Sequence, residues 1–299
     1  MSDARAGARL WPGLALAAAG SIAFSGKAII VKLAYRHGVD AVTLIMLRML
    51  FALPLFALLA WWAGRGQARL ERRDLVAIAG LGFSGYYLAS FLDFAGLQFI
   101  SASLERLILY LNPTLVLLLG MALGGPRASA RQWLALGVSY AGVLLVFGHE
   151  VNFAGAGSAL GAALVFGSAA SYAVYLVYSG REVKRLGALR LTGWATSVAC
   201  VLCLLQFVLL RPLGSIAEVA TPVLWLSVLN AVACTFAPVL MVMMAIERLG
   251  PTITAQTGMI GPISTLAMGV LILGEPLNAW IAAGTVLVLA GVWLLARAR

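Results

Sequence analysis

Long apolar runs, separated by short polar segments, follow one another along the whole chain. They cover residues 11–34, 41–63, 75–98, 101–123, 132–148, 158–180, 190–210, 222–246, 251–273 and 277–296. A helix of about 20 apolar residues spans the ~30 Å hydrocarbon core of a bilayer. The pattern therefore predicts an all-α membrane protein with ten transmembrane helices. The first run follows Arg5 and Arg9, as in a secretory signal peptide, but it is too long for one, so we expect a retained helix.

Composition agrees with a membrane protein and gives it an orientation. Of 299 residues, 62% are apolar and 11% charged, against ~45–50% and ~25% in soluble domains. The net charge of +10 could indicate a nucleic-acid partner, but the basic residues lie mostly in connections on one side of the ten-helix map. The other side receives only Arg36 and Arg211. This asymmetry predicts an integral protein of the bacterial cytoplasmic (inner) membrane, with both termini cytoplasmic and no nucleic-acid partner.

The sequence contains an internal repeat of five helices. An offset of 149 positions aligns Pro113 with Pro262, Gly120 with Gly269, and residues 141–143 with residues 290–292. Because five is an odd number, the second copy must enter the membrane in the opposite orientation. We therefore expect two inverted five-helix repeats, at residues 11–148 (the first half) and 158–296 (the second half). Secondary transporters use this architecture to enclose a site near the bilayer midplane.

Three features together resemble the drug/metabolite transporter superfamily, in its EamA family of ten-helix exporters. They are the two repeats, Leu47-Arg48 in the second helix, and Leu273-Gly274-Glu275-Pro276 at the end of the ninth. The first half ends in Gly124-Gly125-Pro126, so a carboxylate role at that position has no support. Within the family the chain is most similar to bacterial aromatic amino acid exporters. The resemblance implies a transporter that exports small metabolites, foremost aromatic amino acids, by alternating access.

Pro113 and Pro262 lie near the middle of the fourth and ninth predicted helices. Each proline removes a backbone hydrogen bond and frees a carbonyl, and paired breaks in two repeats indicate a transporter site. A kink needed only for packing is the alternative. The residues expected to contact substrate are Phe24, Ser25, Tyr86, Tyr87, Ser90, Tyr110, Asn112, Tyr172, Tyr175, Asn230, Thr235 and Gln256. For each of them, contact between helices is an equal alternative.

Inside the helices of the first half, five charged residues form a candidate group: Lys27, Arg48, Asp93, Glu105 and Arg106. A cation at the bilayer centre costs about 2.5–3.5 kcal/mol, so we expect mutual pairing or a wet cavity. We expect a gate or charge network on the outer side of the midplane, with Lys27 meeting a substrate carboxylate. A static ion-pair cluster is the alternative, and either proton exchange or facilitated diffusion is open as the energy source.

Other functions receive less support from the residues. A channel would require a symmetric ring of charges or carbonyls, and a carrier of nucleosides, sugars or cationic drugs would share the fold. An intramembrane protease would need a histidine base near Ser84, whereas His37 and His149 are remote from it. Cys200 and Cys203 lie in an apolar helix, where packing is expected. We expect no catalysis, metal or cofactor; the expected partners are membrane lipid and a small-molecule substrate, bound by a monomer.

Overall fold

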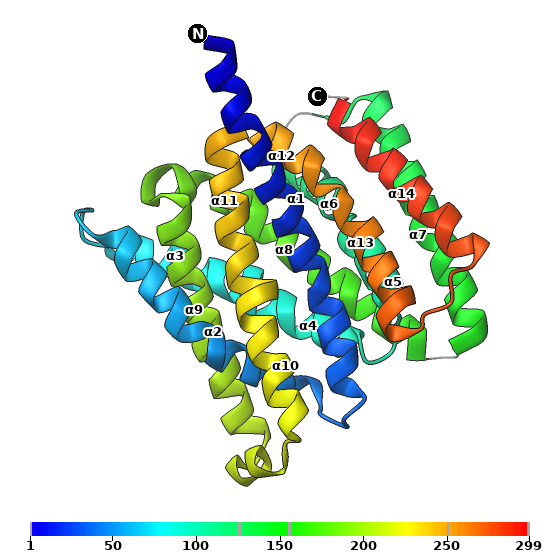
Figure 1. Cartoon of the computed structure of the whole chain (residues 1–299), viewed down its shortest axis with the longest axis horizontal. Coiled ribbons are helices and arrows are strands. Elements are labelled where there is room, and N and C mark those ends of the chain that lie inside the picture. Colours follow the sequence, from blue (N-terminus) through cyan, green and yellow to red (C-terminus); the bar gives the residue numbers. More distant parts are fainter. Residues whose placement is uncertain (1, 125–126, 155–156, 250, 298–299) are drawn as a thin grey trace.

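The computed structural model describes residues 2–124, 127–154, 157–249 and 251–297. Six helices run without interruption: α1 (Ser2–Tyr35), α2 (Ala41–Gly64), α7 (Ala130–Ala154), α8 (Gly157–Leu186), α9 (Ala188–Leu210) and α14 (Ala279–Arg297). A short 3₁₀ helix, η2 (Leu213–Glu218), connects α9 to the next element. The beginning of α1 and the end of α14 lie at the same end of the bundle (Figure 1).

The other helical segments are built from shorter pieces. The third comprises α3 (Arg72–Leu81), the π-helical η1 (Gly82–Leu88) and α4 (Ala89–Gly96). The fourth comprises α5 (Ala102–Leu109) and α6 (Asn112–Ala122), and the eighth α10 (Thr221–Ala231), the π-helical η3 (Val232–Phe236) and α11 (Ala237–Leu249). The ninth comprises α12 (Pro251–Gly258), α13 (Ile260–Met268) and the π-helical η4 (Gly269–Leu273).

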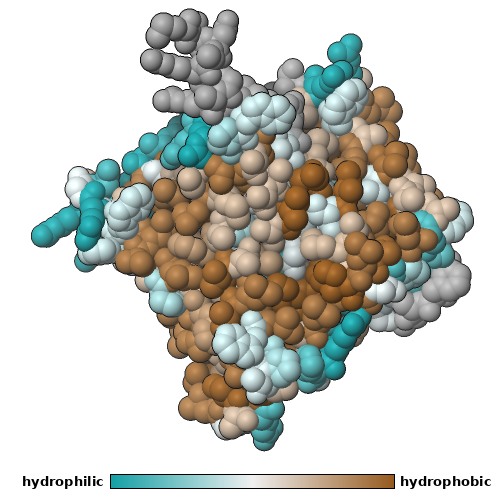
Figure 2. All heavy atoms as spheres, in the orientation of Figure 1, coloured by the Kyte–Doolittle hydropathy of each residue, from teal (hydrophilic) through white to brown (hydrophobic). Residues whose placement is uncertain are grey.

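The helices of the described residues confirm an all-α membrane architecture. Nine of them are long and apolar enough to cross a bilayer. The run predicted at residues 251–273 is not one long helix, because it is divided at Met259 and leaves a shorter apolar helix, Ile260–Leu273. The ten-span count therefore stays a prediction. Figure 2 shows apolar side chains over much of the visible surface, with hydrophilic ones gathered toward its margins.

Local signals fix where the helices begin. The carboxylate of Asp40 accepts hydrogen bonds from the backbone N–H groups of Val42 (2.9 Å) and Thr43 (3.3 Å) at the start of α2. At α5 the hydroxyl of Ser101 accepts from the backbone N–H of Leu104 (3.0 Å). Both caps satisfy N–H groups that have no partner inside the helix.

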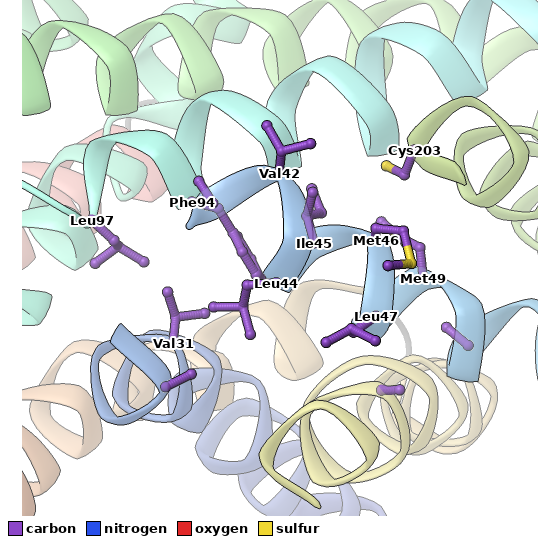
Figure 3. Close-up of a cluster of buried hydrophobic side chains, with 14 of the residues drawn as sticks. Val31, Val42, Leu44, Ile45, Met46, Leu47, Met49, Phe94, Leu97 and Cys203 are labelled. Atoms are coloured by element: carbon purple, nitrogen blue, oxygen red, sulfur yellow. The ribbon is translucent and has the colours of Figure 1, made fainter. Parts of the chain in front are cut away.

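Packing of α2 organises the main core. Figure 3 shows Phe94 of α4, Leu97 directly after α4, Val31 of α1 and Cys203 of α9 around the side chains of α2. Elsewhere α1 packs along α11, α8 along α4, and α7 along α14. The first-half helices are thus interleaved with those of the second half, and residues from both halves meet in the interior.

Candidate substrate-binding cavity

A cavity of about 320 Å³ lies between the two halves. Its aromatic lining comes from Phe24, Phe56, Tyr86, Tyr110 and Tyr172, and its uncharged polar lining from Ser90, Asn112, Ser168, Thr196 and Thr235. Four charged residues, Lys27, Arg48, Asp93 and Arg106, complete one wall. The volume lies at the lower end of the range for small-molecule sites, and mixed apolar and polar walls are typical of them.

One ammonium group joins two carboxylates beside the cavity. The Nζ atom of Lys27 forms an ion pair with Asp93 and a second one with Glu105, at 3.1 Å. The three side chains are 9%, 3% and 0% exposed. Burying one of these charges without its partners would cost several kcal/mol, so the burial of each charge depends on the other two.

Two guanidinium groups lie in the same wall without joining that unit. Arg106 donates from Nη2 to the hydroxyl of Ser25 (2.9 Å) and lies over the rings of Phe24 (5.5 Å) and Tyr110 (5.2 Å). Arg48 lies over the ring of Phe94, 4.6 Å from its centroid. Cation–π contacts of this kind stabilise a cation in a desolvated place.

Three tyrosines form a contiguous aromatic surface. The hydroxyls of Tyr86 and Tyr175 are 3.1 Å apart, and their rings meet edge to face at 5.1 Å. Tyr172 stacks on Tyr175 at 5.4 Å. Only Tyr86 and Tyr172 line the cavity, so Tyr175 supports the two rings from behind.

The fourth and ninth helices are both interrupted near their prolines, and the break in the fourth helix lines the cavity. The fourth helix is interrupted between Leu109 and Asn112, and the ninth at Met259. The amide of Asn112 donates to the carbonyl of Leu109 (2.8 Å). In the ninth helix the carbonyl of Gly258 instead accepts from the hydroxyls of Ser21 (2.8 Å) and Tyr110 (2.9 Å). These are the two carbonyls that the prolines at 113 and 262 leave without an N–H partner.

Two π-helical turns supply residues to the cavity, and neither was predicted from the sequence. Residues 82–88 and 232–236 correspond under the 149-residue offset. They supply Gly85, Tyr86 and Thr235 to the lining. The hydroxyl of Thr235 donates to the carbonyl of Asn230, five residues earlier (2.8 Å). Such turns inside α-helices often occur at functional sites.

The structure brings many of the predicted site residues to the cavity. Its lining includes Phe24, Tyr86, Ser90, Tyr110, Asn112, Tyr172 and Thr235, with Lys27, Arg48, Asp93 and Arg106. Five others do not line it: Ser25 and Tyr175 support lining residues, Tyr87 contacts Phe83, Asn230 is buried, and Glu105 lies behind Lys27. The side chain of Gln256 lies outside the described residues. Four of the five predicted charged residues therefore line the cavity, and a gating role for them stays a prediction.

Several lining residues were not predicted, among them Met49, Phe56, Thr196 and Val239. Met49 and Phe56 are seven residues apart, so they share one face of α2. That spacing, with Arg48 next to Met49, was the available signal, but the rest of α2 is almost wholly apolar, and apolar residues on every face of a helix do not reveal which face lines a cavity.

Glu275, from the Leu-Gly-Glu-Pro segment, caps a helix of the first half. Its carboxylate accepts from the backbone N–H groups of Ala102 (2.7 Å) and Ser103 (3.3 Å) and from the Ser103 hydroxyl (2.7 Å). Glu150 accepts from the N–H of Ser101 (2.6 Å). Negative charge at a helix N-terminus is favourable, so both carboxylates stabilise the start of α5, and Glu275 also ties the second half to the first there.

Comparison with known proteins agrees with this arrangement. The chain matches the EamA-like transporter family over residues 11–148 and 159–297. It is 30% identical over 264 residues to "Uncharacterized transporter YcbK" of Bacillus subtilis (strain 168), covering 87% of this chain and 84% of the relative. It is 24% identical to an "Uncharacterized transporter" of Archaeoglobus fulgidus, covering 91% and 92%. A solved crystal structure shares the fold, with a TM-score of 0.64 at 20% identity, covering 95% of this chain and 97% of the other.

Proposed function

Because this chain belongs to the EamA-like transporter family, we propose that it is a secondary transporter that exports small metabolites, foremost aromatic amino acids. The observation that carries the proposal is the cavity between the halves, where tyrosine and phenylalanine rings face charged and hydroxyl groups. Rings accommodate a flat apolar side chain, and the polar wall suits a charged backbone group. A volume of about 320 Å³ leaves room for one such molecule.

We propose that transport follows alternating access between inverted repeats. The packing pairs support this, because moving each helix by one repeat converts the α1–α11 pair into the α8–α4 pair. The corresponding π-turns and the paired proline breaks support it further. In such transporters the two halves rock around a central site. We propose cytoplasmic positions for both termini, so that substrate enters from the cytoplasm.

The proposal is tested by counterflow in proteoliposomes preloaded in each case with the unlabelled form of the compound under test. Labelled phenylalanine, tyrosine, tryptophan, alanine, a nucleoside, a sugar and a cationic dye form the panel. The expected result is saturable accumulation of the aromatic amino acids, which a channel would not give. Conductance without saturation would mean that the protein is a channel and not a carrier. Counterflow of the dye or nucleoside alone would mean that aromatic amino acids are not its substrates.

A matched pair of variants locates the path. Ser90 lines the cavity, whereas Leu271 is 83% exposed on the outer surface of the helices. Ser90→Phe should abolish counterflow by filling the cavity, and Leu271→Phe should leave it unchanged. Equal activity of Ser90→Phe and the unaltered protein would place the transport path elsewhere.

A further inference from the structure

Arg48 is a buried cation whose hydrogen-bonding capacity is almost unused. Its residue is 4% exposed and lines the cavity. Within the described part of the chain, its single hydrogen bond is the weak one from Nη2 to the sulfur of Met49 (3.9 Å), and its Nε has no partner. A guanidinium presents five N–H donors in a rigid fork that matches a carboxylate. Its ring contact with Phe94 satisfies none of them.

Arg106 repeats this situation less extremely. It is 6% exposed, it lines the same cavity, and its Nε also has no partner among the described residues. The hydroxyl of Ser25 takes one of its donors. No described carboxylate oxygen comes within the 4.0 Å of an ion pair with either guanidinium.

The acidic groups nearby are already engaged. Asp93 and Glu105 both pair with Lys27, so three cations face two carboxylates in this part of the interior. The group therefore carries one net positive charge with all its members ionised. An isolated charge in hydrocarbon is unfavourable, and intramembrane ionisable residues pair or mark a ligand path.

We infer that the cavity binds the carboxylate of its substrate through the guanidinium groups of Arg48 and Arg106. Arg48 provides the main contact, because it has no oxygen acceptor of its own, and Arg106 provides a second. One incoming carboxylate supplies the single negative charge that balances the group. The inference rests on the proposed function in taking the cavity as the substrate site, and it deepens that function by naming the substrate's required group. The ammonium group of an amino acid is then dispensable for binding.

The inference is tested on the unaltered protein with pairs of compounds that differ only in charge. The purified transporter is heated in detergent with 3-phenylpropionate or 3-phenylpropylamine, and with hexanoate or hexylamine, at equal ionic strength. Each carboxylate should raise the melting temperature in a saturable way, with the phenyl compound acting at lower concentration, and each amine should not. An amine that stabilises as well as its carboxylate, or no stabilisation by either carboxylate, would overturn the inference. A larger rise in melting temperature with phenyl phosphate would mean that the site prefers a dianion to a carboxylate, and would overturn the inference.

Variants then assign the contact to its residue. Arg48→Gln should weaken the 3-phenylpropionate effect at least tenfold, Arg106→Gln less, and Arg48→Lys should recover part of it by restoring the charge. Arg65 serves as the matched control, because its guanidinium lies over Trp61 at the end of α2 and away from the cavity lining. Arg65→Gln should bind as the unaltered protein does. Equal binding by all four variants would exclude Arg48 and Arg106 as the carboxylate contact.

The inference and the proposed function can fail separately. Carboxylate binding that depends on Arg48 without any counterflow would remove the transport proposal and keep the inference. Counterflow of aromatic amino acids that 3-phenylpropylamine inhibits as strongly as 3-phenylpropionate would keep transport and remove the inference. If Arg48→Gln does not fold, the compound pairs on the unaltered protein still decide.

Discussion

The two proline-broken helices satisfy the same chemical need in different ways. In the first half, the carbonyl of Leu109 is satisfied by the side chain of Asn112, three residues away on the same chain segment. In the second half, the carbonyl of Gly258 is satisfied by Ser21 and Tyr110, which both belong to the first half. One break is therefore self-contained, and the other is a joint between the halves.

The difference follows from a single position. Asn112 precedes Pro113, whereas Gly261 precedes Pro262 at the corresponding place. Glycine has no side chain to reach back to the freed carbonyl, but it lets Arg106 and Tyr110 approach closely, and Ser25 donates to its carbonyl (3.0 Å). Under the proposed alternating access, a break held from the other half would respond to movement between the halves, so the second-half break is the better candidate for transmitting it.

Gly261→Ala should have the largest effect on this joint. A Cβ atom at residue 261 would lie 2.6 Å from Nη2 of Arg106 and 2.6 Å from the hydroxyl of Tyr110. Overpacking of this kind costs about 3 kcal/mol at its upper range, and here it would also displace two cavity residues. We expect the free energy of unfolding, measured by SDS titration in mixed micelles, to fall by that amount, with loss of counterflow.

Gly258→Ala is the matched control on the same break, because a Cβ there would meet only the Ser21 hydroxyl, at 4.0 Å. It should cost less than half as much. Similar losses for the two glycine variants would mean that the helix break itself, and not the contact between the halves, is what alanine disturbs.

Removing both donors to Gly258 should come next in size. With Tyr110→Phe or Ser21→Ala alone, the other hydroxyl still satisfies the carbonyl, and hydrogen bonds between membrane helices are worth about 0.6 kcal/mol on average. The double variant leaves the carbonyl unpaired, which costs about 2 kcal/mol. We therefore expect a double-mutant cycle in SDS titration with a loss greater than the sum of the single losses. Strictly additive losses in the double variant would contradict the view that Ser21 and Tyr110 together satisfy the Gly258 carbonyl.

The sequence was sufficient to place these breaks but not their partners. Pro113 and Pro262 identify the freed carbonyls through local backbone chemistry alone. The contact of Ser21 with Gly258 joins residues 237 positions apart, and only the packing of α1 against α12 and α13 creates it. The cap that Glu275 provides for α5 is equally remote, across 173 positions.

The sequence also could not predict which residue on one face of a helix reaches the cavity. Tyr172 and Tyr175 are three residues apart, which rotates them by about 60° around the helix. Their spacing predicts a shared face, and both do lie on the inner side, but only Tyr172 reaches the cavity. The π-turns at residues 82–88 and 232–236 change the angle between successive side chains in their own helices. The spacing of apolar residues does not predict such turns.

Asn112→Ala should have a smaller and purely local effect. It leaves the Leu109 carbonyl without its side-chain donor, at a cost of about 1 kcal/mol. The decisive measurement is its combination with Ser21→Ala, whose energies of unfolding should add because the two side chains serve different carbonyls. A coupling as large as that between Ser21 and Tyr110 would show that the two breaks form one unit, so that neither is self-contained.

The smallest effect is expected at the exposed contact between the halves, the ion pair of Asp40 and Arg211. Asp40 caps α2 and also accepts from Arg211 of the second half (3.2 Å). Partial burial opposes ionisation of Asp40, but hydrogen bonds from Thr43 and Arg211 outweigh it and lower the pKa of its carboxyl. A lowered pKa adds stability above the ordinary value near 4, and this contribution is lost as the pH falls through the folded-state pKa.

Asp40→Asn keeps a good helix cap and removes only the charge. An exposed ion pair is worth about 0.2–1 kcal/mol, so the variant should lose that little in SDS titration at pH 7. The gap between the variant and the unaltered protein should close as the pH is lowered below 4, and added salt should narrow it at pH 7. A loss as large as that of the Ser21 and Tyr110 double variant would mean that contact between the halves matters equally wherever it occurs, so that the buried joint at Gly258 holds no special place.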